Sequence, residues 1–217
     1  MQGEKWGVHD QYTFERFKNE LINEPNKPFL KFIFSLSSHE PFDVPMEKVY
    51  KDPYVNSIHY TDRCLGKLFK DIKQTEIWNN TLFILIADHG TTGPQNATAL
   101  NKERYHIPML WVGGALAVKD TVISNTGSQT DMAATLLNQL KISSSGFPFS
   151  KNLLAKKVNE FAFFVYPNAF GLITPKGYFV YDNTSKKIAY TQGTVSETDI
   201  ENGKAYLQVI SADHLKR

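Results

Sequence analysis

Apolar residues recur along this chain first at helical spacing and, beyond residue 158, in short strand-like runs. Residues 11–22 place Phe and Leu side chains on one helical face behind Asp10, which we predict to be the helix cap. A longer helix is predicted from Tyr54 to Lys73 on the same grounds. Three apolar runs have the length of strands, and the first two are expected to be buried: 29–37, 81–87 and 107–114.

The second half of the chain carries helix and turn signals of its own. Ser128 and Asp131 predict a capping box in front of a helix that ends near Leu140. Beyond residue 158, short apolar runs separated by Pro, Gly and Asn predict an antiparallel meander, and residues 197–214 a closing helix. The order of elements predicts an α/β fold with a sheet sandwiched between helices, followed by a small antiparallel β subdomain.

Composition narrows the class of protein only slightly. With 217 residues, 41% of them hydrophobic, the chain can bury a sizeable core. A formal net charge of +2 gives no reason to expect a nucleic-acid partner. The single cysteine, Cys64, excludes an internal disulfide and a cysteine-rich zinc site. No window approaches the roughly 20 apolar residues that span a bilayer.

Candidate chemistry lies directly after the two apolar runs that we expect to be buried. Asp88 and His89 follow residues 81–87, and His39 follows residues 29–37. Polar residues at the carboxyl ends of buried strands line the ligand crevice of open α/β sheets. A carboxylate beside an imidazole suits a divalent metal such as zinc or manganese. Gly90 would let the backbone turn without crowding the ion.

Each of these residues also has a plainer interpretation. Asp88, His89 and Gly90 could form a polar turn after a strand, although the adjoining loop, rich in Gly, Thr and Asn, is more typical of a site. His39 could cap a turn before a proline. His106, which precedes the third apolar run, is more often structural than functional in such a position.

Six segments resemble, in order and spacing, the sulfatase-like enzymes that include lipoteichoic acid synthases, phosphoethanolamine transferases and arylsulfatases. The segments are WGVHD at 6–10, SLSSHEPFDVP at 35–45, YVNSIHYTDRCLGKLF at 54–69, LFILIADHG at 82–90, YHIPMLWVGG at 105–114 and SQTDMAATLLNQL at 128–140. The resemblance implies an alkaline phosphatase/sulfatase-like fold. Residues 1–150 would be the C-terminal portion of its catalytic domain, and residues 151–217 a small α+β subdomain packed on it.

The resemblance also implies a chemistry and a role for each matching residue. Asp88 and His89 match the family's metal-binding pair, and the metal would be a divalent zinc, manganese, calcium or magnesium ion. His39 matches a histidine that contacts the substrate's phosphate or sulfate group. His106 occupies the place of a histidine found in some branches, as a phosphate contact or a second metal ligand. The implied activity is metal-dependent hydrolysis or transfer of a phosphate or sulfate ester.

The nucleophile and an acidic ligand precede the WG..D segment by many residues in this family, whereas five residues precede Trp6 here. We therefore expect a fragment that lacks the nucleophile, binds metal weakly and is inactive alone.

Cys64 lies in a predicted helix without the sequence context of a formylglycine precursor. By family analogy the whole protein would be membrane-anchored and extracytoplasmic. The alternative is a non-catalytic binding module derived from the truncated fold.

Overall fold

The structure is a computed structural model that describes residues 7–23, 28–92, 97–118 and 120–217. The chain divides into two compact units, Met1–Leu85 with Leu110–Lys119 and Ile86–Met109 with Asp120–Arg217. The boundary that we predict near residue 150 separates the family's catalytic domain from a C-terminal subdomain. This division differs in kind from the division into compact units, and it stays a prediction. Among the described residues, no helix is both long and apolar enough to cross a membrane.

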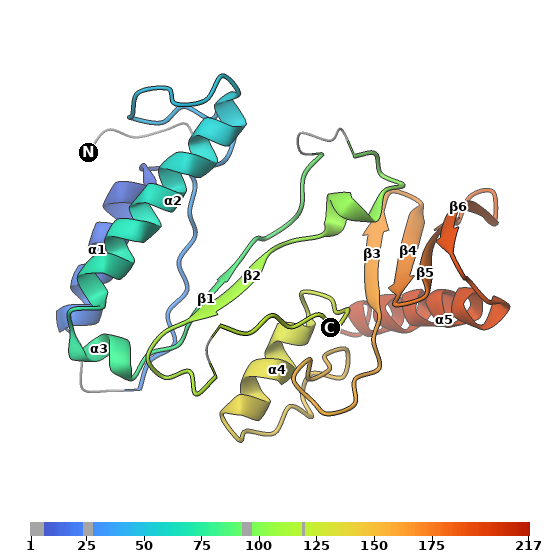
Figure 1. Cartoon of the computed structure of the whole chain (residues 1–217). Coiled ribbons are helices and arrows are strands. Elements are labelled where there is room, and N and C mark those ends of the chain that lie inside the picture. Colours follow the sequence, from blue (N-terminus) through green and yellow to red (C-terminus); the bar gives the residue numbers. More distant parts are fainter. Residues whose placement is uncertain (1–6, 24–27, 93–96, 119) are drawn as a thin grey trace. The chain divides into compact units, whose positions relative to one another are not determined.

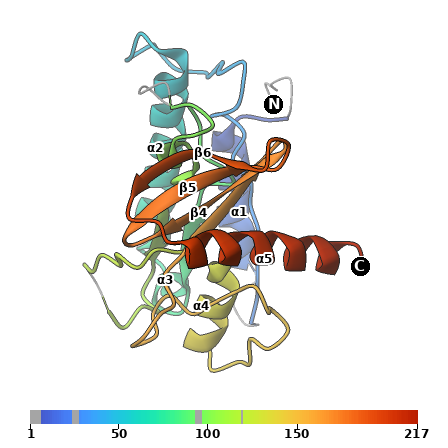
Figure 2. The same ribbon diagram turned by 90° about the vertical axis from the view of Figure 1, so that its right-hand side faces the viewer.

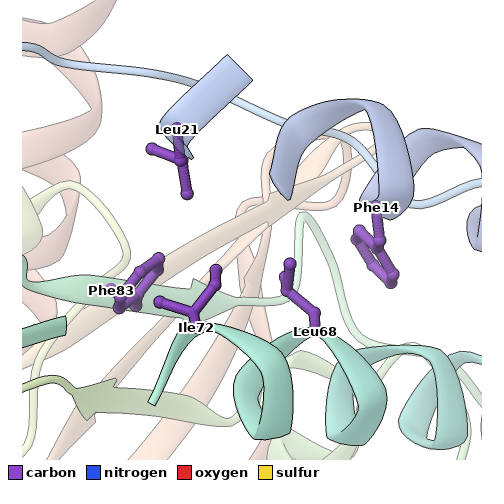
Figure 3. Close-up of a cluster of buried hydrophobic side chains, with 5 residues drawn as sticks. All are labelled: Phe14, Leu21, Leu68, Ile72 and Phe83. Carbon is purple, nitrogen blue, oxygen red and sulfur yellow. The ribbon is translucent and has the colours of Figure 1, made fainter. Parts of the chain in front are cut away.

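The first unit is built on two helices that pack along each other, α1 (Asp10–Asn23) and α2 (Pro53–Ile72) (Figure 1). Helix α2 begins after Asp52, whose carboxylate accepts the Tyr54 N–H at 2.8 Å. A short helix, α3 (Glu76–Asn79), follows. Both long helices confirm the prediction from apolar spacing. Their buried side chains form one cluster with the first strand (Figure 3): Phe14, Leu21, Leu68, Ile72 and Phe83.

Asp10 does not cap α1 as predicted, because it is the first residue of the helix and its carboxylate holds distant segments. It is fully buried. One oxygen accepts the backbone N–H groups of Leu36 at 2.8 Å and Ser37 at 3.3 Å, and the other accepts the Thr61 hydroxyl at 2.6 Å. The Asp10 N–H donates to the Ser37 hydroxyl at 2.9 Å. The carboxylate thus ties the segment before His39 to both helices.

The predicted interior strand at residues 29–37 is wrong for the described structure. This segment is extended but belongs to neither sheet. Its side chains alternate: Ile33 packs against the helical cluster, whereas Phe32 and Phe34 are each 76% exposed. An apolar run predicts burial, but a strand also needs a hydrogen-bonded neighbour, and the described residues supply none here.

The other two predicted strands are present with tighter limits, as β1 (Phe83–Ile86) and β2 (Met109–Val112), which pair with each other. The chain leaves β2 through Gly113, whose φ is +134°. A Cβ there would lie 2.1 Å from the Thr81 carbonyl oxygen, so the close approach requires glycine.

The second unit contains a four-stranded antiparallel sheet in which each strand pairs with the next along the chain, confirming the predicted meander. Its strands are β3 (Ala162–Tyr166), β4 (Ala169–Thr174), β5 (Gly177–Asp182) and β6 (Lys187–Gly193). Helix α5 (Glu197–His214) crosses one face, as Figure 2 shows. The helix approaches closely at Gly203, where a Cβ would lie 2.7 Å from the Phe170 ring.

Only half of the predicted capping box forms before α4 (Asp131–Gln139), another helix of this unit. The Ser128 N–H donates to the Asp131 carboxylate at 2.7 Å, as in such a box. The Ser128 hydroxyl instead accepts the Phe163 N–H of β3 at 3.0 Å. Asp131 is also buried and accepts from Lys151 through both its backbone N–H and its ammonium group. The motif therefore joins α4 to the sheet.

Replacing Asp10 by alanine should destabilise the chain by about 3 kcal/mol, because three donors would lose a buried charged acceptor. Asp10→Asn, which keeps one carbonyl oxygen, should cost less. Urea unfolding followed by circular dichroism measures both. Asp62→Ala, on the exposed side of α2, is the control and should change stability by less than about 0.5 kcal/mol. An equal effect of Asp10→Ala and Asp62→Ala would refute the role of Asp10.

Replacing both Phe32 and Phe34 by serine should leave the chain's stability within about 0.5 kcal/mol, because both side chains are exposed. It should also reduce self-association, since exposed aromatic groups favour contacts between molecules. Urea unfolding and concentration-dependent light scattering test the two parts. The buried control Leu68→Ala should cost about 2–5 kcal/mol. A loss of stability of that size in the double variant would contradict the prediction and would mean that Phe32 and Phe34 are buried in solution.

Candidate functional site

The predicted metal-binding pair lies at the end of β1, where the strand has stopped and the chain turns. Asp88 and His89 are the second and third residues after Ile86, and their side chains are 77% and 76% exposed. The His89 N–H donates to one Asp88 carboxylate oxygen at 2.9 Å. The other Asp88 oxygen lies 3.6 Å from His89 Nε2. The structure therefore brings these two side chains to one place.

The imidazole of His89 is oriented by the backbone of the next residue. Its Nδ1 lies 2.8 Å from the carbonyl oxygen of Gly90. Since a carbonyl only accepts, this contact is a hydrogen bond when Nδ1 carries the proton, which leaves the lone pair on Nε2. A backbone carbonyl is a usual second partner of a metal-binding histidine. In this tautomer the lone pair is on Nε2, the nitrogen that lies 3.6 Å from Asp88 Oδ2.

The two donor atoms fit a shared cation in type and separation. Two ligands each about 2.1 Å from a tetrahedral ion are about 3.4 Å apart, close to the 3.6 Å between Asp88 Oδ2 and His89 Nε2. Oxygen and imidazole nitrogen together suit zinc or manganese. A structural or catalytic zinc has at least three protein ligands, however. Across the described ranges, no group of three His, Cys, Asp or Glu side chains could hold a metal.

Two elements of the second unit fix the backbone around the pair. Gly90 packs against the 3-10 helix η1 (Lys102–Tyr105), where an added Cβ would lie 1.8 Å from the Arg104 carbonyl oxygen. The side-chain amide of Gln129, just before α4, donates to the carbonyl oxygens of Ala87 at 2.7 Å and Asp88 at 3.2 Å. Gln129 was not among the predicted site residues, since local spacing does not reveal a partner more than 40 residues away in sequence.

His106 and His39 occupy exposed positions in different units. His106 ends η1, and its N–H donates to the Glu103 carbonyl at 3.4 Å. His39 lies in a turn of the first unit, where its N–H donates to the Leu36 carbonyl at 3.0 Å and its Nδ1 lies 3.0 Å from the Glu40 carbonyl oxygen. The substrate-contact roles of both histidines stay predictions.

Cys64 lies within α2 and is partly buried. It packs against the buried helical cluster, and burial raises the pKa of its thiol. Burial also raises the pKa of the neighbouring Tyr60 hydroxyl. A thiol whose pKa is raised is a poor nucleophile near neutral pH. The structure places Cys64 inside a helix, as predicted.

Comparison with solved structures shows which fold this chain has. The solved structures that it resembles include a protein in the alkaline phosphatase superfamily from Vibrio parahaemolyticus, with a TM-score of 0.82 and 24% identity. That match covers 99% of this chain and 56% of the other. The lipoteichoic acid synthase LtaP from Listeria monocytogenes matches with a TM-score of 0.69 and 18% identity, over 95% of this chain and 59% of the other. The predicted fold class is confirmed.

The sequence places the chain more narrowly within that class. The family model described as Sulfatase matches residues 1–142, and the chain belongs to the sulfatase family. Phosphoglycerol transferase I of Xanthomonas axonopodis pv. citri is 24% identical over 164 residues, covering 69% of this chain and 23% of that protein. The lipoteichoic acid synthase-like YvgJ of Bacillus subtilis is 22% identical over 182 residues, covering 72% and 29%. The chain thus spans about a quarter of the length of these relatives.

Alkylation of Cys64 should be slow at pH 7.5 and should keep accelerating above pH 9. The sign follows from the raised thiol pKa, because the reactive thiolate forms only as pH approaches that pKa. Iodoacetamide labelling followed by mass spectrometry from pH 7 to pH 10 measures the rate. The chain unfolded in urea serves as the control and should react like a small thiol. A rate that levels off below pH 8 in the folded chain would contradict the assignment.

Proposed function

We propose that this chain forms part of an enzyme that cleaves or transfers a phosphate or sulfate ester with the help of a divalent metal ion. Asp88 and His89 are two of the metal's ligands. The observation that carries the proposal is their convergence, with Oδ2 and Nε2 3.6 Å apart at the end of β1, inside the region matched by the sulfatase family. When bound, the ion supplies Lewis-acid stabilisation of charge on the transferring group.

Phosphate esters are the favoured substrates, because the relatives include a phosphoglycerol transferase and a lipoteichoic acid synthase-like protein. A glycerol-phosphate head group carries the negative charge that such a site requires. In this proposal His106, which is exposed and lies in the same unit as Asp88 and His89, donates a hydrogen bond to a phosphate oxygen, since imidazole N–H groups bind anionic oxygen. The phosphate contact proposed for His39 rests on the family resemblance alone. A sulfate ester has similar tetrahedral oxygens and is the second substrate class.

The remaining metal ligands and the attacking hydroxyl would come from polypeptide outside these 217 residues. Two donors leave a zinc site one ligand short of a usual catalytic centre. On this proposal the isolated chain binds metal weakly and does not turn over substrate. Membrane anchoring and an extracytoplasmic position belong to the same proposal and rest on family analogy alone.

Manganese titration of the 217-residue chain, followed by nuclear magnetic resonance, tests the ligand pair even if binding is weak. The paramagnetic ion should broaden the signals of Asp88, His89 and Gly90 first, and a chelator should restore them. His89→Ala and Asp88→Asn should each weaken this effect at least about tenfold, since even outer-shell partners of metal ligands contribute about 10–100-fold. His214→Ala, at the exposed end of α5, is the control and should behave like the wild type.

Two outcomes would count against the proposal. Broadening centred elsewhere, and unchanged by His89→Ala, would remove the metal role of the pair. Binding of glycerol phosphate that neither the chelator nor His89→Ala alters would favour the non-catalytic binding module.

A further inference from the structure

The side chain of Gln129 spans two successive carbonyl groups at the end of β1. Its amide nitrogen lies 2.7 Å from the Ala87 oxygen and 3.2 Å from the Asp88 oxygen. These carbonyls belong to residues beyond Ile86, the last residue of β1, where the Ala87 N–H still donates to the Pro108 carbonyl at 3.4 Å. A side-chain donor therefore supplies hydrogen bonds that the strand cannot, at the residue that carries the metal-binding carboxylate.

Gln129 is itself exposed, but the residues close to it in sequence are held by part-buried contacts. Ser128, before it, bonds to the Phe163 N–H of β3 through its hydroxyl and to Asp131 through its N–H. Asp131, two residues after it, is 1% exposed and pairs with Lys151, whose ammonium group also donates to the Phe161 carbonyl at 2.9 Å. These contacts hold the backbone that carries Gln129, and its side-chain amide reaches the turn from this fixed position.

The opposite side of the turn is fixed by packing. Gly90 lies against the Arg104 carbonyl so closely that a Cβ would not fit. The same glycine's carbonyl bonds to His89 Nδ1. The backbone from Ala87 to Gly90 is thus fixed by Gln129 at one end and by η1 at the other. Both exposed side chains of the pair leave the chain between these two points.

We infer that Gln129 is a positioning residue that sets the direction of the Asp88 and His89 side chains and so raises their affinity for a divalent cation. The inference rests on the proposed function for its metal-binding consequence. In this inference Gln129 acts through its amide nitrogen, which donates to the two backbone carbonyls, and not as a metal ligand. It acts through the backbone, as outer-shell partners of metal ligands do.

Gln129→Met tests this role, because it keeps the length of the side chain and removes the donor without adding charge. In the metal-free chain, the carbonyl carbon signals of Ala87 and Asp88 should shift, while those of the β3–β6 sheet stay in place. In the manganese titration, the midpoint of broadening at residues 88–90 should move to about tenfold higher metal concentration. Gln208→Met, an exposed glutamine on α5, is the matched control and should change neither readout.

The outcomes separate this inference from the proposed function. If manganese broadens residues 88–90 equally in wild type and Gln129→Met, the positioning role is wrong while the metal site stands. If the carbonyl signals do not shift, the hydrogen bonds are absent in solution and the inference is overturned. If the wild type shows no manganese effect at the turn, the proposed function fails, and the metal-positioning role fails with it. If the β3–β6 sheet unfolds in Gln129→Met, the residue is needed for stability of the fold, and the positioning role is overturned.

Discussion

Strand geometry sets the main constraint on this site. Consecutive side chains of a β-strand point to opposite faces, so an adjacent Asp and His within a strand could not bind the same metal ion. Strand β1 ends at Ile86, and Asp88 and His89 lie in the turn beyond it. That position lets their donor atoms approach to 3.6 Å. A turn has no strand ladder to hold its backbone. The hydrogen bonds from Gln129 and the packing of Gly90 against η1 hold it instead.

Buried carboxylates perform the same task in both units. Asp10 binds the backbone N–H groups of Leu36 and Ser37, shortly before His39. Asp131 binds backbone N–H groups on either side of α4, next to Gln129. A buried carboxylate with several donors is costly to remove and has few alternative arrangements, so it holds irregular segments in place where no strand ladder does. In each unit, a candidate site residue lies close to such an anchor.

The sequence predicted what depends on local pattern and failed where the partner is distant. Helical spacing and turn residues located the long helices and the meander, because these report contacts within a few residues. Residues 29–37 carry the composition of an interior strand, but pairing depends on a neighbour that the segment does not encode. Asp10 and Ser128 have the residue types of caps, and long-range donors compete successfully for both side chains. Gln129 lies within the segment 128–140 that carries the family resemblance, but no local pattern indicated its contacts with the Ala87 and Asp88 carbonyls.

Exposure decides what the Asp88 and His89 pair can do by itself. Both side chains are more than three-quarters exposed, so water competes for each donor, and the ion would keep much of its hydration. Orientation by Gln129 and Gly90 reduces the entropy lost on binding but cannot add a third ligand. Strong binding therefore requires another group to approach from the open side. The exposure that makes the pair weak alone is also what allows a further ligand and a substrate phosphate to reach it.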